Sequence, residues 1–479
     1  MQIGAFFLTH FLVFEFVQHC RCNNQLQSTS LSIFIKPETS IYTQQACISS
    51  SSEKTLLKKV PDAGRHNTPL NATRLGSSDA RSSRALKSSV GLVYKFDQVD
   101  VEPILESSEL NDLDGFVKQQ CYSHEDDDAQ EPICIYLNYK FDHGRGMVFL
   151  SYPSIFKEIL TTFTIFKTDK AHTGQEKTSE QKFEVVDMPQ KGGKGSVASR
   201  RFYPGDPVVS EHLVFIMLSE PEVFARKDIN KIMKRAVDYL PFETRATFAT
   251  LHGEGDTQED WIRSTFKRNN FYIPLKANDR EYRFGAIVFQ PTRLNHDCRP
   301  NTAYYVDGVT LTLHMHALRD IAPGEELTDS YIDTSTYRDE RKQNLQKNYG
   351  FDCTCSICSL PSHMIKLSDY HIEKIQKLNA ALDNYTPTSI ATPGMAEQLI
   401  NLYKLERLDI TIYKAYTRAS VAYNAVGDTD QAKIYAALAL THGLIAAGPR
   451  WSDWPTVLKL EQNPEEHWSY KSRLPKPTS

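Results

Sequence analysis

The chain lacks an excess of charge of either sign. Lysine and arginine number 55, and aspartate and glutamate 59, among 479 residues, which gives a formal net charge of −4. Proteins that hold a phosphate backbone concentrate basic side chains, and a nearly balanced composition supplies no broad basic surface. Direct nucleic-acid binding is therefore not indicated.

The chain also lacks a long uninterrupted apolar run. Its most apolar stretch, residues 1–17, is too short for a spanning helix and is interrupted by His10 and Glu15. That length suits the apolar core of a secretory signal, but no lysine or arginine precedes it and no small-residue cleavage pattern follows it. For residues 1–22, a signal peptide and a non-secretory apolar N-terminus both stay open, and so does a secretory location.

Cysteine is absent between residues 134 and 298 but crowded near residue 355. Of the nine cysteines, Cys353, Cys355 and Cys358 fall within six residues. This clustering favours metal ligation over a disulfide framework spread along the chain. A tetrahedral zinc site needs a fourth ligand, which spacing alone does not select. Oxidation of the thiols remains an alternative if the chain is secreted.

Length and composition divide the chain into several units. A chain of 479 residues is expected to form two to four of them. Residues 23–90 are rich in small polar side chains and too poor in apolar ones to bury a core, which predicts a flexible leader. Short β-type runs, such as Ile133–Leu137, predict a small α+β lead-in over residues 91–182.

The remaining pattern alternates between strand and helix. Strand-like residues begin at Phe183 and resume at Phe284, and helical spacing between them predicts a helical insert over about residues 213–283. Residues 361–479 are helical in pattern. Small and aromatic residues at 419–439 suit one tetratricopeptide-type hairpin, and a plain antiparallel helix pair fits equally well.

Four blocks of sequence carry the chemistry. In chain order they are Gly193-Lys194-Gly195, the heptad Asn295-His296-Asp297-Cys298-Arg299-Pro300-Asn301, the run from Gly324 to Asp333 that contains Tyr331, and the cysteine triplet preceded by Phe351. The glycine block is weak alone, because glycines between strands usually only make a turn. Together the four resemble the catalytic half of SET-domain protein methyltransferases. The helical tail more loosely resembles SMYD and fungal SET proteins, although the zinc-rich MYND module of SMYD proteins is missing.

The resemblance implies an α+β fold. It comprises a β-rich SET fold with a pseudo-knot and a helical insert over residues 183–333, a zinc-binding post-SET segment over 334–360, and an α-helical, TPR-like region over 361–479. Asn301 would support the knot-like crossing of the chain. Asp297 departs from the serine that the family usually has, which puts the local hydrogen bonding in doubt.

The resemblance also implies two bound groups. S-adenosylmethionine would contact Gly193, Lys194, Gly195, Asn295, His296 and Phe351. A zinc ion would be held by Cys298, Cys353, Cys355 and Cys358. For Asn295 and His296, the alternative is a polar turn with satisfied side chains.

Tyr331 matches the tyrosine that borders the methyl-transfer channel, so it is the predicted catalytic residue, although a tyrosine in a β-rich segment is more often part of the core. The implied activity is S-adenosylmethionine-dependent methylation of protein lysine, on a histone or another protein. The amine must lose its proton before attack, since lysine has a pKa of about 10.4, and no dedicated general base is evident.

Two alternatives to an active enzyme stay open. One is a catalytically weak SET scaffold that binds partner proteins, and the other is a secreted, disulfide-linked protein with an inactive SET-like fold. The family resemblance favours a nuclear or cytoplasmic monomer with a protein or peptide substrate. The sequence does not identify the target lysine or the number of methyl groups added.

Overall fold

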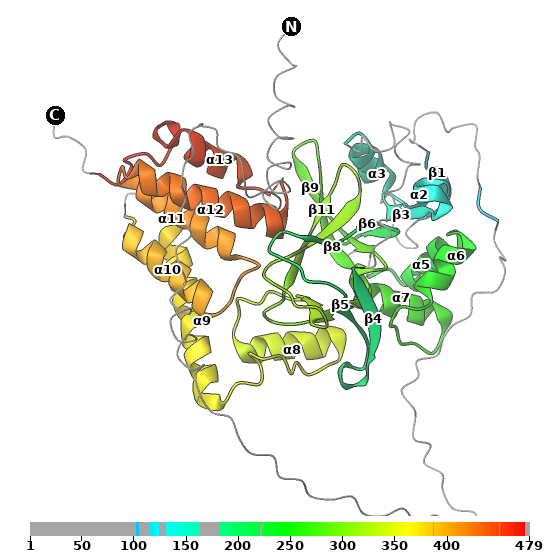
Figure 1. Ribbon diagram of the computed structural model, residues 1–479. Coiled ribbons are helices and arrows are strands. Elements are labelled where there is room, and N and C mark those ends of the chain that lie inside the picture. The colour runs from blue at the N-terminus through cyan, green and yellow to red at the C-terminus, as the bar shows by residue number, and fades with distance from the viewer. Residues whose placement is uncertain are drawn as a thin grey trace, which may run out of the picture. The chain divides into compact units, whose positions relative to one another are not determined.

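The structure is a computed structural model, and it describes residues 102–104, 115–123, 131–162, 182–220, 223, 225–386, 388–449 and 451–474. The segments predicted as an apolar N-terminus and a flexible leader lie outside these residues. Helices and strands are mixed throughout the described part, which confirms the predicted α+β class (Figure 1). Among the described helices, none combines the length and the apolar character that crossing a bilayer requires.

The largest sheet has six strands in the order β1-β2-β3-β7-β9-β8. They are β1 (Val117–Tyr122), β2 (Ile133–Asn138), β3 (Met147–Ser151), β7 (Phe215–Leu218), β9 (Arg280–Ile287) and β8 (Phe271–Ala277). Every residue of β2, β3 and β7 is buried, as expected for strands that are covered on both faces. Because β3 pairs with β7, the strands of the predicted lead-in share one sheet with residues from the predicted SET region.

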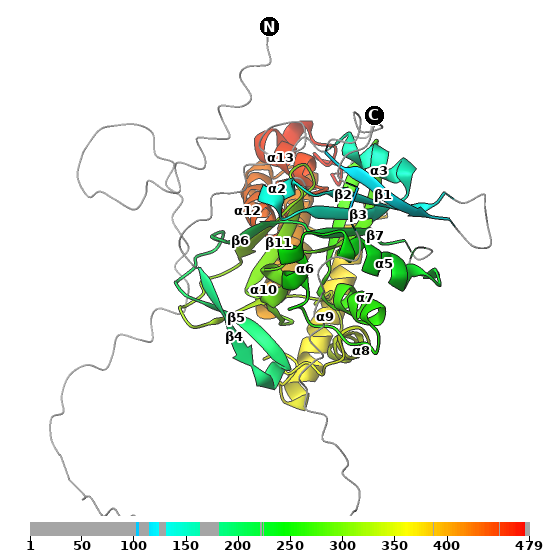
Figure 2. The ribbon, with the colours of Figure 1, turned by 90° about the vertical axis from the view of Figure 1, so that its right-hand side faces the viewer.

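Helices cover this sheet. They are the short α2 (Phe141–Gly144), α3 (Pro153–Leu160), α5 (Ile229–Asp238), α6 (Phe242–Phe248) and α7 (Gln258–Asn269). Figure 2 shows α3 on one side of the sheet and α5 and α7 on the other. The buried face of α5 consists of Ile229, Ile232, Met233, Ala236 and Val237, at the helical spacing read from the sequence. Helix α5 therefore packs its apolar face against the sheet. The segment predicted as a helical insert, about residues 213–283, is only partly helical, because β7 and β8 also lie within it.

Two smaller sheets form the other β-structure. One has the order β10-β13-β5-β4 and the other β11-β12-β6. Their strands are β10 (Asn295–His296), β13 (Glu326–Asp329), β5 (Gly193–Ala198), β4 (Phe183–Met188), β11 (Thr302–Asp307), β12 (Thr312–Ala317) and β6 (Pro207–His212). The 3-10 turn η4 (Pro189–Lys191) joins β4 to β5 and ends at Gly192, whose φ of 78° favours glycine. A second 3-10 turn, η5 (Pro291–Arg293), leads into β10.

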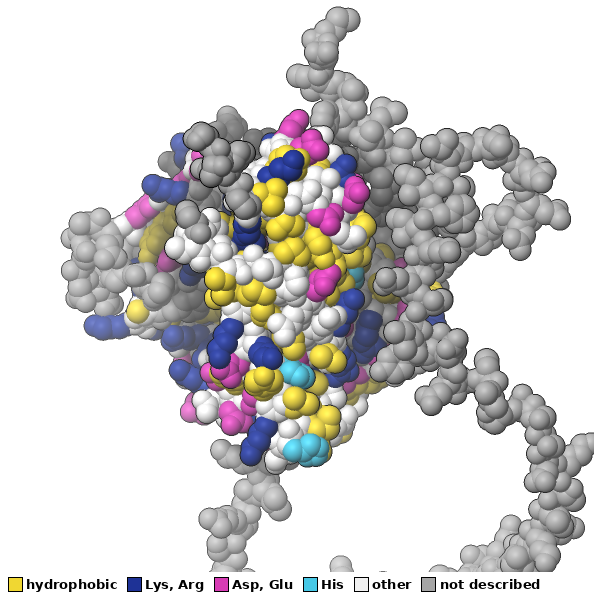
Figure 3. Space-filling view, turned by 90° about the vertical axis from the view of Figure 1, so that its left-hand side faces the viewer, with side chains coloured by type: hydrophobic (Ala, Val, Ile, Leu, Met, Phe, Trp, Pro, Cys, Tyr) yellow, Lys and Arg dark blue, Asp and Glu magenta, His cyan; other side chains and the backbone are white. Residues whose placement is uncertain are grey.

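The C-terminal part is helical and has a core of its own. After α8 (Arg338–Tyr349) come α9 (Ser362–Leu382), α10 (Pro393–Leu405), α11 (Ile412–Ala425), α12 (Thr429–Ala447), α13 (Trp454–Gln462) and the 3-10 turn η6 (Pro464–Glu466). Small buried residues, among them Ala419 and Ala436, let α11 and α12 pack closely. Figure 3 shows the side of the molecule on which these helices lie. Basic, acidic and hydrophobic side chains are mixed on this surface, and no large patch carries charge of one sign.

A buried ion pair ties the helical part to the heptad. Arg299 donates from Nη2 to Oε2 of Glu406, which follows the end of α10, over 3.1 Å. Ser368 and His371 of α9 bond the same carboxylate over 2.7 and 2.8 Å. The loop that carries Cys298 is therefore fixed through Glu406, a residue that α9 also holds.

The β1–β2 hairpin carries a disulfide between Cys121 and Cys134. The two residues face each other in the antiparallel register, with their Cα atoms 4.0 Å apart. Sequence analysis did not predict this pairing. The sequence pattern marked only the clustered cysteines, and it assigned no partner to Cys121 or Cys134.

Candidate functional site

The heptad and the Tyr331 block meet side by side in the structure. Strand β10 pairs in parallel with β13, which places Asn295 opposite Thr328 and His296 opposite Asp329. Asn301 lies at the other end of the heptad and is also held by β13. Its Nδ2 donates to the Glu326 carbonyl over 2.8 Å, and its Oδ1 accepts from the Thr328 amide over 2.8 Å. Residues far apart in sequence thus form one small layer.

Asp297, the departure from the family pattern, has hydrogen bonds within the heptad layer. Its Oδ1 accepts from the backbone N–H of Arg299 over 2.8 Å, and its own N–H donates to the Asp329 carbonyl over 2.9 Å. Burial raises the pKa of the Asp297 carboxyl. The aspartate therefore closes a local turn without leaving the backbone unpaired.

His296 links the Tyr331 block to the cysteines. Its Nδ1 accepts from the backbone N–H of Tyr331 over 3.1 Å, and its Nε2 lies 3.3 Å from Cys298 Sγ. Burial lowers the pKa of His296 to about 4, so the ring is neutral near pH 7 and can carry its single proton on Nε2. Both ring nitrogens have partners inside the protein, which leaves the backbone and the ring face for other contacts.

Asn295 and Gly195 are in close contact. A Cβ atom at Gly195 would lie 2.5 Å from Nδ2 of Asn295 and 2.4 Å from Sδ of Met188, so any other residue there would have to displace one or both side chains. The Asn295 amide donates to Oε1 of Glu326 over 3.0 Å. The close approach of β5 to the heptad explains one glycine of the first block.

The other two residues of the first block lie toward solvent. Gly193 is exposed, and a Cβ atom placed there would meet nothing within 4 Å. Lys194 is exposed and pairs with Asp187 over 2.8 Å. Space therefore remains beside the backbone at the start of β5.

The four predicted metal ligands come together. The sulfur atoms of Cys298, Cys353, Cys355 and Cys358 all lie within 4.8 Å of one another. Sγ of Cys298 is 4.0 Å from Sγ of Cys353 and 3.6 Å from that of Cys358. Tetrahedral zinc with bonds of about 2.3 Å requires sulfur–sulfur separations of roughly 3.8 Å, so the donor set suits zinc.

A buried cation lies beside this cluster. Arg341 of α8 is 1% exposed, and its Nη1 donates to the carbonyl of Thr336. Burial lowers the pKa of Arg341, whereas the negative charge of Cys298 and Cys358 raises it, and the net change is upward. The guanidinium is therefore placed to offset the negative charge of thiolates.

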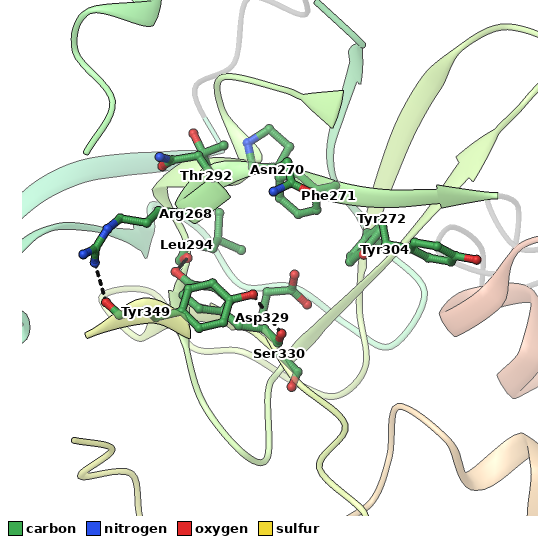
Figure 4. Close-up of a pocket in the computed structure, with 13 residues that line it drawn as sticks. Arg268, Asn270, Phe271, Tyr272, Thr292, Leu294, Tyr304, Asp329, Ser330 and Tyr349 are labelled. Atoms are coloured by element: carbon green, nitrogen blue, oxygen red, sulfur yellow. Dashed lines mark hydrogen bonds between the residues drawn. The ribbon is translucent and has the colours of Figure 1, made fainter. Parts of the chain in front are cut away.

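Tyr331 lies at a cavity of about 200 Å³ (Figure 4). The lining comprises Arg268, Asn269, Asn270, Phe271, Tyr272, Pro291, Thr292, Leu294, Tyr304, Asp329, Ser330, Tyr331 and Tyr349. None of the predicted cofactor residues is in this set. Tyr331 therefore lines the cavity, and its backbone N–H is bonded to His296 of the heptad.

The hydroxyl and ring of Tyr331 are fixed. The hydroxyl donates to the Leu294 carbonyl over 2.6 Å, and Tyr349, whose ring centroid is 5.0 Å away, donates its hydroxyl to the Tyr331 carbonyl over 3.1 Å. Burial first, and then the charge of Asp329, raises the pKa of Tyr331. The hydroxyl therefore stays protonated near neutral pH.

Sequence reasoning missed several residues of the cavity. Asp329 lies inside the quoted Tyr331 block but had no assigned role, and Tyr349 precedes Phe351 by two residues. Tyr304 and Phe271 come from β11 and β8, and no motif marked them. Phe351 itself packs near the heptad, with its ring centroid 6.2 Å from that of His296.

Comparison with known proteins defines the class to which this fold and site belong. The family model for the SET domain matches residues 193–332, a range that includes the glycine block, the heptad and Tyr331. The chain therefore contains a SET domain, as the sequence resemblance predicted.

Curated relatives narrow the class further. The chain is 25% identical over 294 residues to the histone-lysine N-methyltransferase set5 of Schizosaccharomyces pombe, which covers 60% of this chain and 85% of that protein. It is 42% identical over 133 residues to a SET and MYND domain-containing protein of Dictyostelium discoideum, covering 25% of this chain and 38% of that protein. It is also 42% identical over 76 residues to the histone-lysine N-methyltransferase SMYD1 of Homo sapiens, covering 14% and 16%. Similarity to the last two thus extends over well under two thirds of their length.

Proposed function

We infer that the protein is an S-adenosylmethionine-dependent protein-lysine N-methyltransferase. The observation that carries this inference is the position of Tyr331, which lines an aromatic cavity and whose backbone is bonded to the heptad. The SET domain and relatives named histone-lysine N-methyltransferases support the same activity and do not favour the scaffold alternative. A histone or another protein would supply the lysine.

The cofactor would bind on the heptad side of Tyr331. Gly193, Lys194, Gly195, Asn295, His296 and Phe351 are the residues that would hold it. The open space beside Gly193 and the close approach of Gly195 to Asn295 fit this assignment. S-adenosylmethionine supplies an electrophilic methyl group on a positively charged sulfur.

The protein's own contribution would be binding and orientation. Phe271, Tyr304 and Tyr349 give the cavity aromatic walls, which suit the alkyl chain of lysine and attract its cationic end. The Tyr331 hydroxyl, held by the Leu294 carbonyl, would fix the position of the amine. Alignment of this kind and electrostatic stabilisation by fixed dipoles are large terms in catalysis.

Zinc would be structural in this scheme. Cys298, Cys353, Cys355 and Cys358 would form a closed site without an open coordination position. Because Cys298 belongs to the heptad and Phe351 precedes the triplet, the metal would order residues on the cofactor side. Binding of zinc would therefore precede productive binding of cofactor.

Several finer features belong to the same proposal. Strand β13 pairs with β10 at the start of the heptad and accepts a hydrogen bond from Asn301 at its end. These contacts support a pseudo-knot at Asn301. The α11–α12 hairpin, with small residues at its contact, supports a TPR-like region. The proposed domain limits remain residues 183–333 for the SET domain, 334–360 for the zinc segment and 361–479 for the helical region, and the proposed state is a monomer.

A methylation assay tests the function. Purified full-length protein is incubated with methyl-labelled S-adenosylmethionine and either histones or a non-histone extract, and the products are hydrolysed to identify N-methyl-lysine. Tyr331→Phe is expected to lower the rate on the order of 10²-fold, because the ring remains but the orienting hydroxyl is lost.

Tyr385→Phe, on an exposed ring in the helical part, is the matched control and should retain activity. A wild-type protein that binds the cofactor but labels no lysine would contradict the proposed function. Equal rates for wild type and Tyr331→Phe would remove Tyr331 from the catalytic role.

A further inference from the structure

Asp329 is an unusual member of the cavity lining. Its side chain is buried, with 2% of the residue exposed, and its Oδ1 has no hydrogen-bond partner in the described part of the chain. In Figure 4 its carboxylate points into the open centre of the cavity. A buried carboxylate with a free oxygen is costly unless a ligand compensates it. This geometry points to a missing cationic or hydrogen-bonding partner.

Among the residues that the structure describes, the surroundings of Asp329 offer no such partner. The ionisable side chains of the described lining are Arg268 from α7, Tyr272 from β8, Tyr304 from β11, Tyr349 from α8, and Tyr331. Arg268 is engaged elsewhere, since its Nη1 donates to the Tyr349 carbonyl and its Nη2 to Glu254. Lysine and histidine do not occur among these lining residues. The open position beside Asp329 is therefore left for a ligand.

The cavity suits an alkylammonium group. Aromatic rings attract cations through their faces, and a carboxylate at the same place adds a charge-assisted hydrogen bond. Tyr272 at the rim is 49% exposed, so the cavity reaches the protein surface. An ammonium group on a flexible alkyl chain could thus enter from solvent and reach the carboxylate.

We propose that Asp329 binds the ammonium group of the substrate lysine in this cavity and accepts a proton from it. This inference rests on the proposed lysine methyltransferase function and deepens it by naming a proton acceptor. In the step, an N–H bond of the ammonium breaks, its electron pair stays on nitrogen, and the proton bonds to Oδ1 of Asp329. The proton passes from Asp329 to water after the product leaves.

Burial favours this exchange. An ammonium and a carboxylate buried together carry two charges out of water, whereas the amine and carboxylic acid formed by proton transfer carry none. Burial raises the pKa of Asp329 to about 7, which lets the group exchange protons near neutral pH. Asp329 must be ionised to start the step, so activity should fall as the pH drops below about 7.

Binding of a small probe tests the site without any turnover. Titration calorimetry at pH 8 compares n-butylammonium with neutral 1-butanol on the full-length protein. We expect the wild type to bind the cation at least 10-fold more tightly than Asp329→Asn does, and the two proteins to bind the alcohol alike. Asp320→Asn, which alters an aspartate with a 61% exposed side chain, is the matched control and should behave as wild type.

Kinetics give the second readout. The kcat/KM of the wild type on a lysine peptide should decline as the pH falls below 7. Asp329→Asn should not show this decline, and its kcat/KM should be on the order of 10²-fold lower at pH 7.5. The difference should shrink as the pH approaches 10, where the free amine becomes abundant in solution. Equal binding and equal profiles in wild type and Asp329→Asn would overturn the inference while leaving the proposed function intact.

Two further outcomes separate the proposals. If the wild type labels no lysine but binds n-butylammonium in an Asp329-dependent way, the methyltransferase function fails and the ammonium site stands. If Asp329→Asn does not fold, the wild type alone decides, because its affinity for n-butylammonium should weaken as Asp329 is protonated below pH 7. A wild-type affinity that is constant from pH 5 to pH 8 would exclude Asp329 as the binding group.

Discussion

Two buried carboxylates of this protein have opposite environments. Glu406, 5% exposed, receives hydrogen bonds from Arg299, Ser368 and His371. Asp329, 2% exposed, has a free oxygen facing a cavity. A charge that is fully paired inside the protein holds segments together, whereas a charge without an internal partner is available to a ligand. The contrast separates a structural acid from a functional one within one chain.

The largest effect is expected from breaking the paired site. Glu406→Ala should lower the free energy of unfolding by about 3–5 kcal/mol, because the Arg299 guanidinium remains buried without its charged partner. Denaturant unfolding of the full-length protein measures this loss. The control is Glu373→Ala, which breaks an exposed pair with Lys377 and should cost no more than about 0.5 kcal/mol. A similar loss of unfolding free energy in both variants would show that Glu406 does not stabilise the contact between the heptad and the C-terminal helices.

The pH dependence of the free energy of unfolding should distinguish Asp329, the carboxylate with an unpaired oxygen. Folding raises the pKa of Asp329 from 3.8 to about 7, so the folded state binds this proton more tightly than the unfolded state does. The resulting stability is full below pH 4 and declines as the pH rises to about 7, by at most about 4 kcal/mol. Asp329→Asn should lack this decline, which unfolding curves at pH 4, 5.5 and 7 would reveal. Parallel pH dependences in wild type and variant would show that Asp329 is solvated.

The buried cation Arg341 extends the comparison of paired and unpaired charges to the cysteine cluster. Arg341 lies beside Cys298 and Cys358, and its charge should offset that of a zinc–thiolate site. Arg341→Met keeps much of the side-chain length and should lower zinc affinity by roughly 10- to 100-fold. Competition with a chelator measures the affinity, and elemental analysis of the wild type is expected to give about one zinc per chain. Unchanged affinity would assign Arg341 to packing alone.

The smallest effect concerns a neutral partner of Glu406. Ser368→Ala removes one hydrogen bond to the carboxylate while the pair with Arg299 remains. The expected loss is about 1.5 kcal/mol, the lower end of the range for a hydrogen bond to a charged group. Comparison of its unfolding midpoint with that of Glu406→Ala ranks the partners. A loss as large as that of Glu406→Ala would show that the site has no redundancy.

Sequence reasoning succeeded where the signal was local. The β-type run at Ile133–Leu137 forms most of β2, and the helical pattern read between Phe183 and Phe284 contains α5, α6 and α7. The heptad and the cysteine triplet were visible because each is a short, dense pattern of special residues. The choice of Cys298 as the fourth ligand came from the family resemblance, and the structure places its sulfur beside the other three.

The missed features depend on contacts between distant residues. The partners of Glu406 lie 35, 38 and 107 residues away, a separation that no periodic pattern encodes. The lack of a partner at Asp329 emerges only when β8, β11 and α8 enclose it. Even the nearby Cys121–Cys134 pair required the register of the β1–β2 hairpin. Burial and pairing are properties of the assembled fold, which a single sequence reveals only in part.

The order of synthesis gives the cysteine cluster a further meaning. Cys298 emerges from the ribosome 55 residues before Cys353 and 60 before Cys358. Its heptad can pair with β13 only after residue 329 has been made, and the fourth sulfur arrives later still. Contacts between residues so far apart in sequence slow folding, and the segments made first stay unpaired until their partners have been synthesised. A nascent chain therefore cannot complete a four-sulfur zinc site during most of its translation, and loading of the metal marks a late step in maturation.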